Sequence, residues 1–320
     1  MRYSFIIPVY NRPEEVDELL NSLTRQTNKN FEVLIVEDGS SVPCKEVVDN
    51  YADRLDICYY FKSNSGPGQT RNYGAERGHG EYLIILDSDC ILPEGYLAAV
   101  ESELQRQKAD AFGGPDRAHD SFTNIQKAIN YAMTSFFTTG GIRGGKKKMD
   151  KFYPRSFNMG VRAEVYKALG GFSKMRFGED IDFSIRIFQG GYACRLFPEA
   201  WVWHKRRTDL KKFFKQVHNS GIARINLYKK YPESLKVVHL LPALFTIGIV
   251  FLLLCSLVCS WSLSLLLLVA LIICVDSTLR NKSFKIGLLS ILASFIQLIG
   301  YGTGFLRALS LIHISEPTRL

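Results

Sequence analysis

The sequence predicts an α/β fold in which a mostly parallel sheet has helices on both faces and is followed by C-terminal transmembrane helices. Strand-length apolar segments alternate with helical patterns over residues 2–113, as they do in parallel sheets that are covered by helices. After residue 237, three long segments carry almost no charge, and each is about as long as the hydrocarbon core of a bilayer.

In chain order, four short apolar segments are predicted as strands, at 3–9, 31–36, 57–61 and 82–86. Helices are predicted between and after them, at 13–23, 68–77, 93–108, 162–169 and 180–188. The first helix has Pro13 in its first turn and apolar residues at helical spacing from Val16 to Leu23. Ligands of such sheets bind beyond the carboxyl ends of the strands, so we expect the functional residues in the loops that follow the strands.

Residues 114–157 have no clear pattern and are rich in glycine and lysine between Gly140 and Lys148. Two interpretations of this stretch are open. It is either a mobile lid or acceptor loop, or an ordinary solvated surface loop.

The apolar segments predict a membrane domain over 237–310 with two or three transmembrane helices. Residues 237–259 and 286–306 carry no charge, whereas 262–279 is shorter and contains Asp276. At about 1.5 Å per residue the segments measure roughly 27 to 35 Å, close to a hydrocarbon thickness of about 30 Å. Soluble helices rarely lack charge on every face, which disfavours buried helices of a soluble domain.

Most of the net charge of +9 lies in one band before the first apolar segment, since residues 201–236 contain ten Lys or Arg and two acids. Within this band, 208–236 mixes basic and apolar residues and is predicted to lie on anionic membrane lipids as an amphipathic interfacial segment. Because the charge lies beside apolar segments, lipid headgroups explain it better than nucleic acid does. Basic residues also occur at 280–285, so the positive-inside rule places the N-terminal domain in the cytoplasm.

The ends and the cysteines complete this organisation. The first residues lack the cleavage site of a signal peptide and are expected to form a strand. The seven cysteines show no disulfide or metal-binding spacing, which indicates a reducing compartment. We therefore expect a cytoplasmic domain over 1–207, the interfacial segment, the membrane domain, and a tail over 311–320 that has no structural pattern and resembles a cloning artefact.

Asp87 and Asp89 flank Ser88 directly after the fourth predicted strand. Two carboxylates at this spacing can both lie at the mouth of the sheet. Their oxygens suit a hard divalent cation, whose other ligands would be phosphate oxygens and water. Short acidic turns are also common, so this pair indicates a functional site only in combination with the other motifs.

Two further loops also follow predicted strands. Asp38 lies in an Asp-Gly turn, where it is either an ordinary turn residue or an acceptor of hydrogen bonds from a base or ribose. A glycine-rich loop from Asn64 leads into a helix with Arg71 in its first turn, where backbone N–H groups and a guanidinium can meet phosphate. The loop lacks the Gly-Lys-Ser/Thr ending of a Walker loop.

The fourth motif, Gly178-Glu179-Asp180-Ile181-Asp182, opens a predicted helix. A carboxylate at this place can act as a general base toward a hydroxyl group. Helix capping by acidic residues accounts for the same motif without any catalytic role.

Together and in this order, the four motifs resemble those of glycosyltransferase family 2. The resemblance covers roughly residues 3–225 and includes the opening sequence FIIPVYNR at 5–12. It implies a GT-A-type, Rossmann-like fold. It also implies an inverting transfer of a sugar from a nucleotide diphosphate sugar to an acceptor hydroxyl.

The resemblance further implies roles for individual residues. Asp180 would be the catalytic base, with Glu179 beside it. Asp89, together with Asp87, would hold the metal, and His204 is either a further metal ligand or a structural histidine at a strand end. The implied nucleotide-sugar-binding residues are Pro8, Tyr10, Asn11, Asp38, Arg71, Asn72, Asp87 and Ser88. The implied wall around donor and acceptor comprises Asn158, Met159, Gly160 and Gly171.

The same resemblance implies the cofactor and the partners. The cofactor would be Mn²⁺ or Mg²⁺, and the donor a UDP- or GDP-sugar. The membrane helices suggest a lipid-linked or other glycan acceptor, in cell-surface polysaccharide or glycolipid synthesis. The expected location is the inner (cytoplasmic) membrane, with a multi-pass anchor and the catalytic domain facing the cytoplasm.

One departure from the family pattern narrows the expected reaction. Processive members carry Gln-x-x-Arg-Trp before their membrane helices, whereas Gln216 is followed here by Val-His-Asn-Ser, which favours transfer of a single sugar. A nucleotidyltransferase is an alternative, but it would usually have a glycine-rich, basic loop after the first strand. A non-catalytic, membrane-bound nucleotide-binding protein is another, and the retained acids Asp87, Asp89 and Asp180 disfavour it.

Overall fold

The chain forms two compact units in the computed structural model, which describes residues 2–119, 121–139, 152–259 and 261–311. The first, here called the sheet unit, comprises Met1–His119 and Met149–Lys205. The second, the helical unit, comprises Asp120–Lys148 and Arg206–Leu320. The segment 121–139 therefore groups with the C-terminal helices, whereas the expected N-terminal domain of 1–207 included it.

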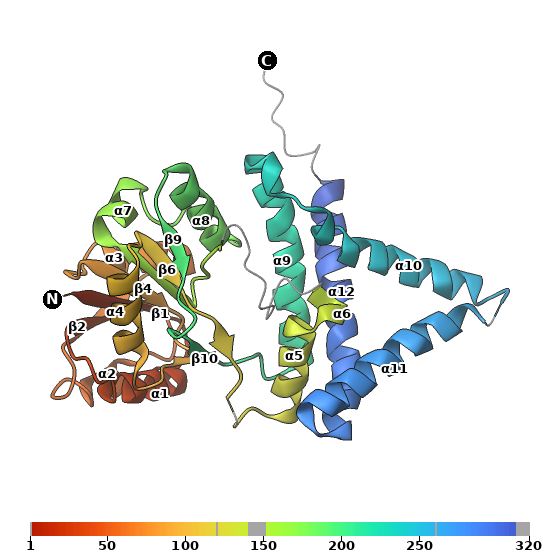
Figure 1. Cartoon of the computed structure of the whole chain (residues 1–320), viewed down its shortest axis with the longest axis horizontal. Coiled ribbons are helices and arrows are strands. Elements are labelled where there is room, and N and C mark those ends of the chain that lie inside the picture. The colour runs from red at the N-terminus through yellow and green to blue at the C-terminus, as the bar shows by residue number, and fades with distance from the viewer. Residues whose placement is uncertain (1, 120, 140–151, 260, 312–320) are drawn as a thin grey trace, which may run out of the picture. The chain divides into compact units, whose positions relative to one another are not determined.

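The sheet unit is built on a seven-stranded sheet in the order β3-β2-β1-β4-β8-β6-β9 (Figure 1). Its strands are β1 (Tyr3–Val9), β2 (Phe31–Asp38), β3 (Ile57–Lys62), β4 (Tyr82–Leu86), β6 (Ala111–Gly113), β8 (Asn158–Arg162) and β9 (Cys194–Leu196). Among these described strands only β8 runs antiparallel to its neighbours, β4 and β6. The mostly parallel sheet that the sequence predicts is therefore confirmed.

A second, small sheet joins three short strands in the order β5-β10-β7. They are β5 (Cys90–Ile91), β10 (Val202–His204) and β7 (Asp116–Arg117). In this sheet His204 lies opposite Cys90, the residue after the Asp87–Asp89 turn. The small sheet thus brings the end of β10 beside the first acidic motif.

Helices cover both faces of the large sheet because its strands are apolar on both sides. In β1, Phe5 and Ile7 belong to one buried cluster with Leu19, whereas Ile6 belongs to a second cluster with Phe183, as the two-residue repeat of a strand requires. The helices of this unit are α1 (Pro13–Thr24), α2 (Lys45–Asp49), α3 (Pro67–Ala75), α4 (Tyr96–Arg106), α7 (Ala163–Ala168) and α8 (Glu179–Gln189).

The expectation that residues 114–157 are irregular is wrong in part. Helix α5 (Asn124–Thr134) lies within them and begins with a capping box, in which Thr123 Oγ1 accepts from the Gln126 N–H and Gln126 Oε1 accepts from the Thr123 N–H. The stretch between Gly140 and Lys148 lies outside the described residues, so its interpretation as a lid stays a prediction.

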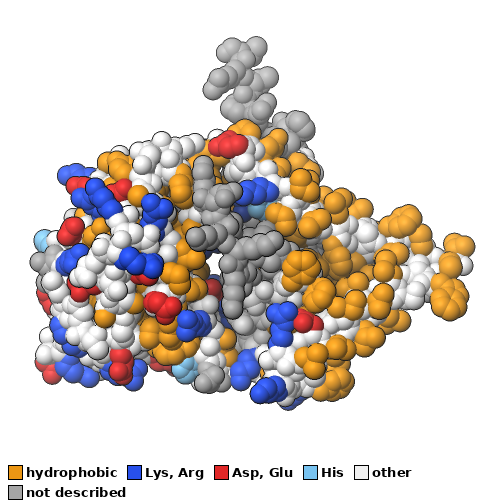
Figure 2. Space-filling model, in the orientation of Figure 1, with side chains coloured by type: hydrophobic (Ala, Val, Ile, Leu, Met, Phe, Trp, Pro, Cys, Tyr) orange, Lys and Arg blue, Asp and Glu red, His pale blue; other side chains and the backbone are white. Residues whose placement is uncertain are grey.

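The helical unit contains the apolar helices that the sequence predicts. Its helices are α5, α6 (Phe136–Thr139), α9 (Leu210–Lys230), α10 (Leu241–Cys255), α11 (Ser262–Asn281) and α12 (Phe284–Ser310), with 3-10 turns at Pro232–Ser234 and Val237–His239. Among the residues that the structure describes, three helices are long and apolar enough to cross a membrane, namely Val237–Cys255, Ser262–Asn281 and Phe284–Ser310. Figure 2 shows apolar side chains gathered over α10 and α11. This finding supports membrane association of the chain.

Candidate active site

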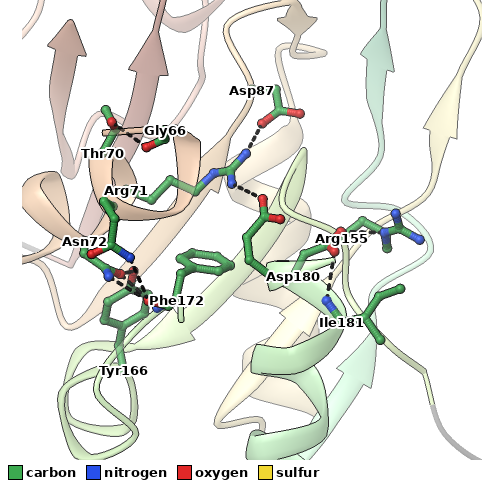
Figure 3. Close-up of polar contacts among 12 residues, drawn as sticks. Gly66, Thr70, Arg71, Asn72, Asp87, Arg155, Tyr166, Phe172, Asp180 and Ile181 are labelled. Atoms are coloured by element: carbon green, nitrogen blue, oxygen red, sulfur yellow. Dashed lines mark hydrogen bonds and ion pairs between the residues drawn. The ribbon is translucent and has the colours of Figure 1, made fainter. Parts of the chain in front are cut away.

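Arg71 joins two of the acidic motifs in the sheet unit. Its Nη2 donates to Asp87 Oδ1 at 2.7 Å, and its Nη1 donates to Glu179 Oε1 at 3.0 Å (Figure 3). The guanidinium is only 4% exposed, and it lies 5.3 Å from the centre of the Phe172 ring. Because Asp87 follows β4 and Glu179 opens α8, acids from separate loops converge on one buried cation.

The position of Arg71 depends on the glycine-rich loop before α3. Gly66 has a φ of 87°, a backbone angle that residues other than glycine rarely adopt. Pro67 then starts the helix, a position that suits its fixed φ and its missing N–H. The local sequence therefore turns the chain sharply and points the first turn of α3 toward the acidic loops.

Asp38, at the end of β2, fastens this loop. Its Oδ1 accepts from the backbone N–H of Ser65 and its Oδ2 from that of Gly66, both at 2.9 Å, and Lys62 Nζ also donates to it. Burial acts to raise the pKa of Asp38, but the hydrogen bond from Lys62 and those from the loop outweigh it and hold the pKa below its usual value. In this structure the carboxylate is thus engaged with the protein, and its contact with a base or ribose stays a prediction.

The adjacent carboxyl groups of Glu179 and Asp180 have opposite electrostatic environments. Burial acts to raise the pKa of both. For Asp180, the attraction of Arg155, whose Nε lies 2.6 Å from Oδ2, outweighs burial and lowers the pKa. For Glu179, Arg71 does not offset burial and the repulsion of Asp180, so the pKa is raised. Pairs of acids whose pKa values are driven apart are typical of sites that move protons.

A second cluster lies around Asp89. Its Oδ2 accepts from Arg12 Nη1 at 2.8 Å, and its Oδ1 lies 3.1 Å from His204 Nε2. The ring of His204 stacks on Phe157 with 4.7 Å between the centroids. One ligand atom each from Asp89, Cys90 and His204 lie within 4.8 Å of one another, which makes this a possible metal site.

The residues of this second cluster fit a divalent metal in part. Carboxylate and imidazole are both suitable ligands, and the buried Nδ1 of His204 has no hydrogen-bond partner among the described residues. Burial raises the pKa of the Cys90 thiol well above its usual value, so this group is a poor ligand for a hard cation. Asp87, also expected to bind metal, is paired instead with Arg71.

Other predicted site residues serve the framework. Asn72 Oδ1 accepts from Tyr166 Oη at 2.6 Å and from the backbone N–H of Phe172 at 2.8 Å. Asn11, at a φ of 54°, accepts from the backbone N–H of Val42 at 2.9 Å. Both side chains therefore hold loops of the candidate site, and direct contact with the nucleotide stays a prediction for them.

The expected donor and acceptor wall lies inside the protein. Asn158 is 1% exposed, and its side chain bonds to Tyr96 and to the backbone of Ala200. Met159 is fully buried, and a Cβ on Gly160 would lie 2.0 Å from the Phe112 ring. Any contact of this strand with a ligand would therefore have to involve the backbone.

The remaining predicted residues lie close to the candidate site along the chain. Pro8 is half-buried in β1, and Tyr10, just after that strand, is 53% exposed. Ser88 is buried between the two acids. Gly171 has a φ of 64°, and a Cβ there would lie 2.4 Å from Asn72 Oδ1. Glycine is required at this position to let the loop approach Asn72.

Three residues at the site escaped the sequence-based prediction. Arg155 lies in the stretch that seemed patternless, and Cys90 follows Asp89 without a recognisable metal-binding spacing. Arg12 belongs to the opening motif, but nothing in that motif shows that its side chain reaches Asp89. The only available signal was general: several acids predicted in one buried site need cations beside them, so nearby arginines are candidate partners.

The mostly parallel sheet, with acidic loops at the carboxyl ends of its strands, has the architecture of a GT-A-type glycosyltransferase domain. The family model described as glycosyl transferase family 2 matches residues 4–170, more than half of the 320 residues. The chain belongs to this family.

Curated relatives extend this match over different lengths. An uncharacterized glycosyltransferase of Rickettsia felis is 33% identical over 137 residues, which cover 43% of this chain but only 22% of the relative. Glycosyltransferase AglE of Haloferax volcanii is 27% identical over 259 residues, covering 73% of this chain and 79% of AglE.

Solved structures share the fold. The mannosyltransferase PcManGT from Pyrobaculum calidifontis, in complex with GDP-Man and Mn²⁺, aligns with a TM-score of 0.65 and 18% identity over 93% of this chain and 87% of its own. Staphylococcus aureus TarS 1–349 with UDP-GlcNAc aligns with a TM-score of 0.51 and 19% identity over 71% of this chain and 67% of its own. At these identities the structures establish the GT-A fold and no more.

Proposed function

We propose that this glycosyltransferase is an inverting, metal-dependent hexosyltransferase that moves one sugar from a UDP- or GDP-sugar to an acceptor hydroxyl. The Arg71 bridge between Asp87 and Glu179 carries the proposal, because it brings the donor-side loop after β4 and the acidic start of α8 into one site. The nucleotide sugars in the complexes of PcManGT and TarS support this class of donor.

Asp180 is the base in this proposal. Because its pKa is lowered, the carboxylate is ionised at neutral pH, and each of its oxygens keeps a lone pair beyond the bonds to Arg155 and Ile181. It takes the proton from the acceptor hydroxyl as that oxygen attacks the anomeric carbon opposite the leaving nucleoside diphosphate. One displacement inverts this carbon, so one base suffices and no covalent sugar–enzyme intermediate is needed.

Glu179 and Arg71 position the groups around that base. Arg71 balances the charge of Asp87 and Glu179, and it directly follows the first turn of α3, where backbone N–H groups favour a bound phosphate. Arg155 keeps Asp180 in place. Bound Mn²⁺ or Mg²⁺, held by Asp89 and His204 with Asp87 nearby, would neutralise charge that develops on the leaving diphosphate.

The acceptor and location follow from the helical unit. In the described part of the chain, three helices are long and apolar enough to cross a membrane. They favour a lipid-linked or other glycan acceptor presented at the cytoplasmic face of the inner membrane, in cell-surface polysaccharide or glycolipid synthesis. Gln216 lies in α9 without a following Arg-Trp pair, and this supports transfer of a single sugar.

The proposal is tested by incubating the purified chain in detergent with a panel of UDP- and GDP-sugars, with Mn²⁺ or Mg²⁺ and with EDTA. We expect one donor to raise Tm and to release nucleoside diphosphate only when metal is present. Release of pyrophosphate from a nucleoside triphosphate would indicate a nucleotidyltransferase instead. Donor binding without any release, across sugar and lipid acceptors, would favour a non-catalytic nucleotide-binding protein.

The metal assignment has its own test. Asp89→Ala should abolish the metal-dependent part of donor binding, which calorimetric titration of Mn²⁺ in the presence of donor measures. Glu18→Ala, at a carboxylate of the same unit that pairs with Lys205, is the control and should leave the titration unchanged. An unaltered titration of the Asp89 variant would exclude Asp89 as a ligand.

A further inference from the structure

Helix α12 differs from the other two candidate membrane spans in what surrounds it. Within their apolar windows, 39% of α12 is buried in the protein, against 11% of Val237–Cys255 and 17% of α11. From Ala293 to Ala308, all of them described, no large apolar side chain of α12 is exposed. The large apolar side chains of this stretch are therefore buried or half-buried against other helices, whereas α10 and α11 carry apolar side chains that protein does not cover.

Helix α9 covers α12 along much of its length. A Cβ on Gly300 would meet the side chain of Val217 at 2.5 Å, and one on Gly304 would meet the backbone of His218 at 2.0 Å. In the other direction, a Cβ on Gly221 would meet the backbone nitrogen of Phe305 at 2.7 Å. The pairs advance together along both chains, so the two helices run side by side in the same direction with their backbones in close approach.

Helix α9 bears charge along its length, whereas a helix within the hydrocarbon core would be expected to be apolar. Six basic residues lie within it, namely Lys211, Lys212, Lys215, Arg224, Lys229 and Lys230. Lys215 and Arg224 are nine positions apart, or about 14 Å along a helix. If α12 crossed a hydrocarbon core of about 30 Å with α9 beside it, both of these cations would lie at membrane depth, which is unfavourable.

Helices α10 and α11 form the remaining two sides of a triangle with α12 (Figure 1). The start of α10 packs on the C-terminal end of α12, where a Cβ on Gly302 would meet Thr246 Oγ1 at 2.1 Å. The end of α11 packs on the N-terminal end of α12, where a Cβ on Gly287 would meet Thr278 Oγ1 at 2.0 Å. The hairpin therefore has its two ends on α12 and its turn away from it.

Charge and apolar surface separate along this hairpin. Its turn exposes apolar side chains, with Leu257, Val258 and Trp261 82%, 94% and 81% exposed. Basic residues lie at its two ends. They are Lys229, Lys230 and Lys236 before α10, Arg280 in the last turn of α11, and Lys282 and Lys285 after it. Asp276, near the end of α11, is paired with Arg280 and accepts from Tyr131 of α5. Acidic and basic groups thus gather on the α12 side, and the turn is apolar.

We infer that α12 lies parallel to the membrane surface and that only the α10–α11 hairpin inserts into the bilayer. The α9–α12 pair then lies on the membrane surface, where the basic residues of α9 meet anionic headgroups, and the α10–α11 hairpin extends from this pair into the hydrocarbon. This arrangement places both ends of α12 on the same side of the membrane as α9. It replaces the third transmembrane helix that the sequence predicts over 286–306.

The sidedness of α12 is the test, with the full chain reconstituted in vesicles of phosphatidylethanolamine and phosphatidylglycerol. In a parent whose exposed cysteines are removed by Cys58→Ala and Cys259→Ala, single cysteines are introduced by Lys211→Cys, Lys285→Cys and Ser310→Cys. All three side chains are exposed, in α9 and near the two ends of α12. The readout is labelling by a membrane-impermeant maleimide before detergent, divided by labelling after detergent.

In vesicles in which the labelled fraction at Lys211 differs clearly from one half, the inference expects the same fraction at all three positions. If α12 spans the bilayer, the fraction at Ser310 becomes the complement of that at Lys285, and the inference is overturned. Leu309→Cys, at a neighbouring exposed position, repeats the measurement should the first C-terminal variant express poorly. Catalytic activity does not enter the readout, so failure of the proposed reaction leaves this test intact.

Discussion

The sheet unit and the helical unit place charge and apolar surface in opposite ways. In the sheet unit, charged side chains lie inside, and Arg71 is held between Asp87 and Glu179 with only 4% of its side chain exposed. In the helical unit, α10 presents Phe251 and Leu254 outward at 63% and 61% exposure. Buried charge is tolerated where partners are fixed, and outward apolar surface is tolerated where lipid replaces water. The two units are thus suited to different surroundings.

The largest expected effect comes from removing the proposed base in the sheet unit. Asp180→Asn should lower the transfer rate by roughly 10²- to 10⁴-fold, because proton removal from the acceptor is lost, while donor affinity is retained. Release of nucleoside diphosphate gives the rate, and calorimetry gives the donor Kd. Glu179→Gln, the matched control, should lose less, since Glu179 holds Arg71 and does not take the proton. Full turnover by the Asp180 variant would remove this residue from the role of base.

Membrane association should break when charge enters the outward apolar surface of the helical unit. Phe251→Asp places a carboxylate on α10 and should disfavour insertion by about 2.5 to 3.5 kcal/mol. Flotation with lipid vesicles measures the bound fraction. The control is Phe61→Asp, because Phe61 is similarly exposed, at 56%, but belongs to β3 of the sheet unit. Equal loss of flotation in both variants would show that the exposed apolar side chains of α10 are not what binds the chain to lipid.

Close helix packing in the helical unit predicts a moderate effect on stability. Gly304→Ala would put a Cβ 2.0 Å from the backbone oxygen of His218, and the strain should cost about 1 to 3 kcal/mol. The expected result is a lower Tm in detergent micelles. Gly248→Ala on α10 is the control, since no atom of the described residues lies within 4 Å of its added Cβ. A Tm that falls equally in both variants would point to detergent effects and against the α9–α12 contact.

The smallest expected effect is a pH-dependent loss of stability in the sheet unit, where the buried carboxylate of Asp38 is paired with Lys62. The folded state lowers the pKa of Asp38, so this carboxylate contributes stability above its unfolded pKa of about 3.9 and loses that contribution as pH falls through the folded pKa. Asp38→Asn should therefore destabilise the chain by about 1 kcal/mol at pH 7, and the difference should shrink in acid. Chemical unfolding at several pH values measures this. A difference that stays constant from pH 7 to pH 3 would show that the ion pair with Lys62 does not stabilise the fold.

Several parts of the fold could be predicted because they are local. Strands β1 and β4 match their predicted bounds, since Tyr3–Val9 and Tyr82–Leu86 are short apolar runs between polar turns. The short strands β6, β9 and β10 were missed, because three residues are too few to show a period. Helix α5 was not predicted. Its capping box at Thr123 and Gln126 is a short signal, and the same stretch is dominated further on by glycine and lysine.

The candidate site divides in the same way. Asp87, Asp89, Glu179 and Asp180 were found from their places after a strand or at a helix start. Their partners were not, since Arg12 and Arg155 are far from Asp89 and Asp180 in sequence and meet them only in the folded chain. The sequence also did not show that the side chains of Asp38 and Asn72 form hydrogen bonds with other residues of the sheet unit.

By itself the sequence determined the family, the mostly parallel sheet, the acidic loops and the three apolar helices, because each depends on residues close together in the chain. The tertiary structure alone decided which cation each acid meets and which apolar helix is covered by protein. Arg71 reaches Glu179 across 108 positions, and Gly304 reaches His218 across a whole hairpin. Such contacts depend on how elements pack in space, and no local periodicity encodes them.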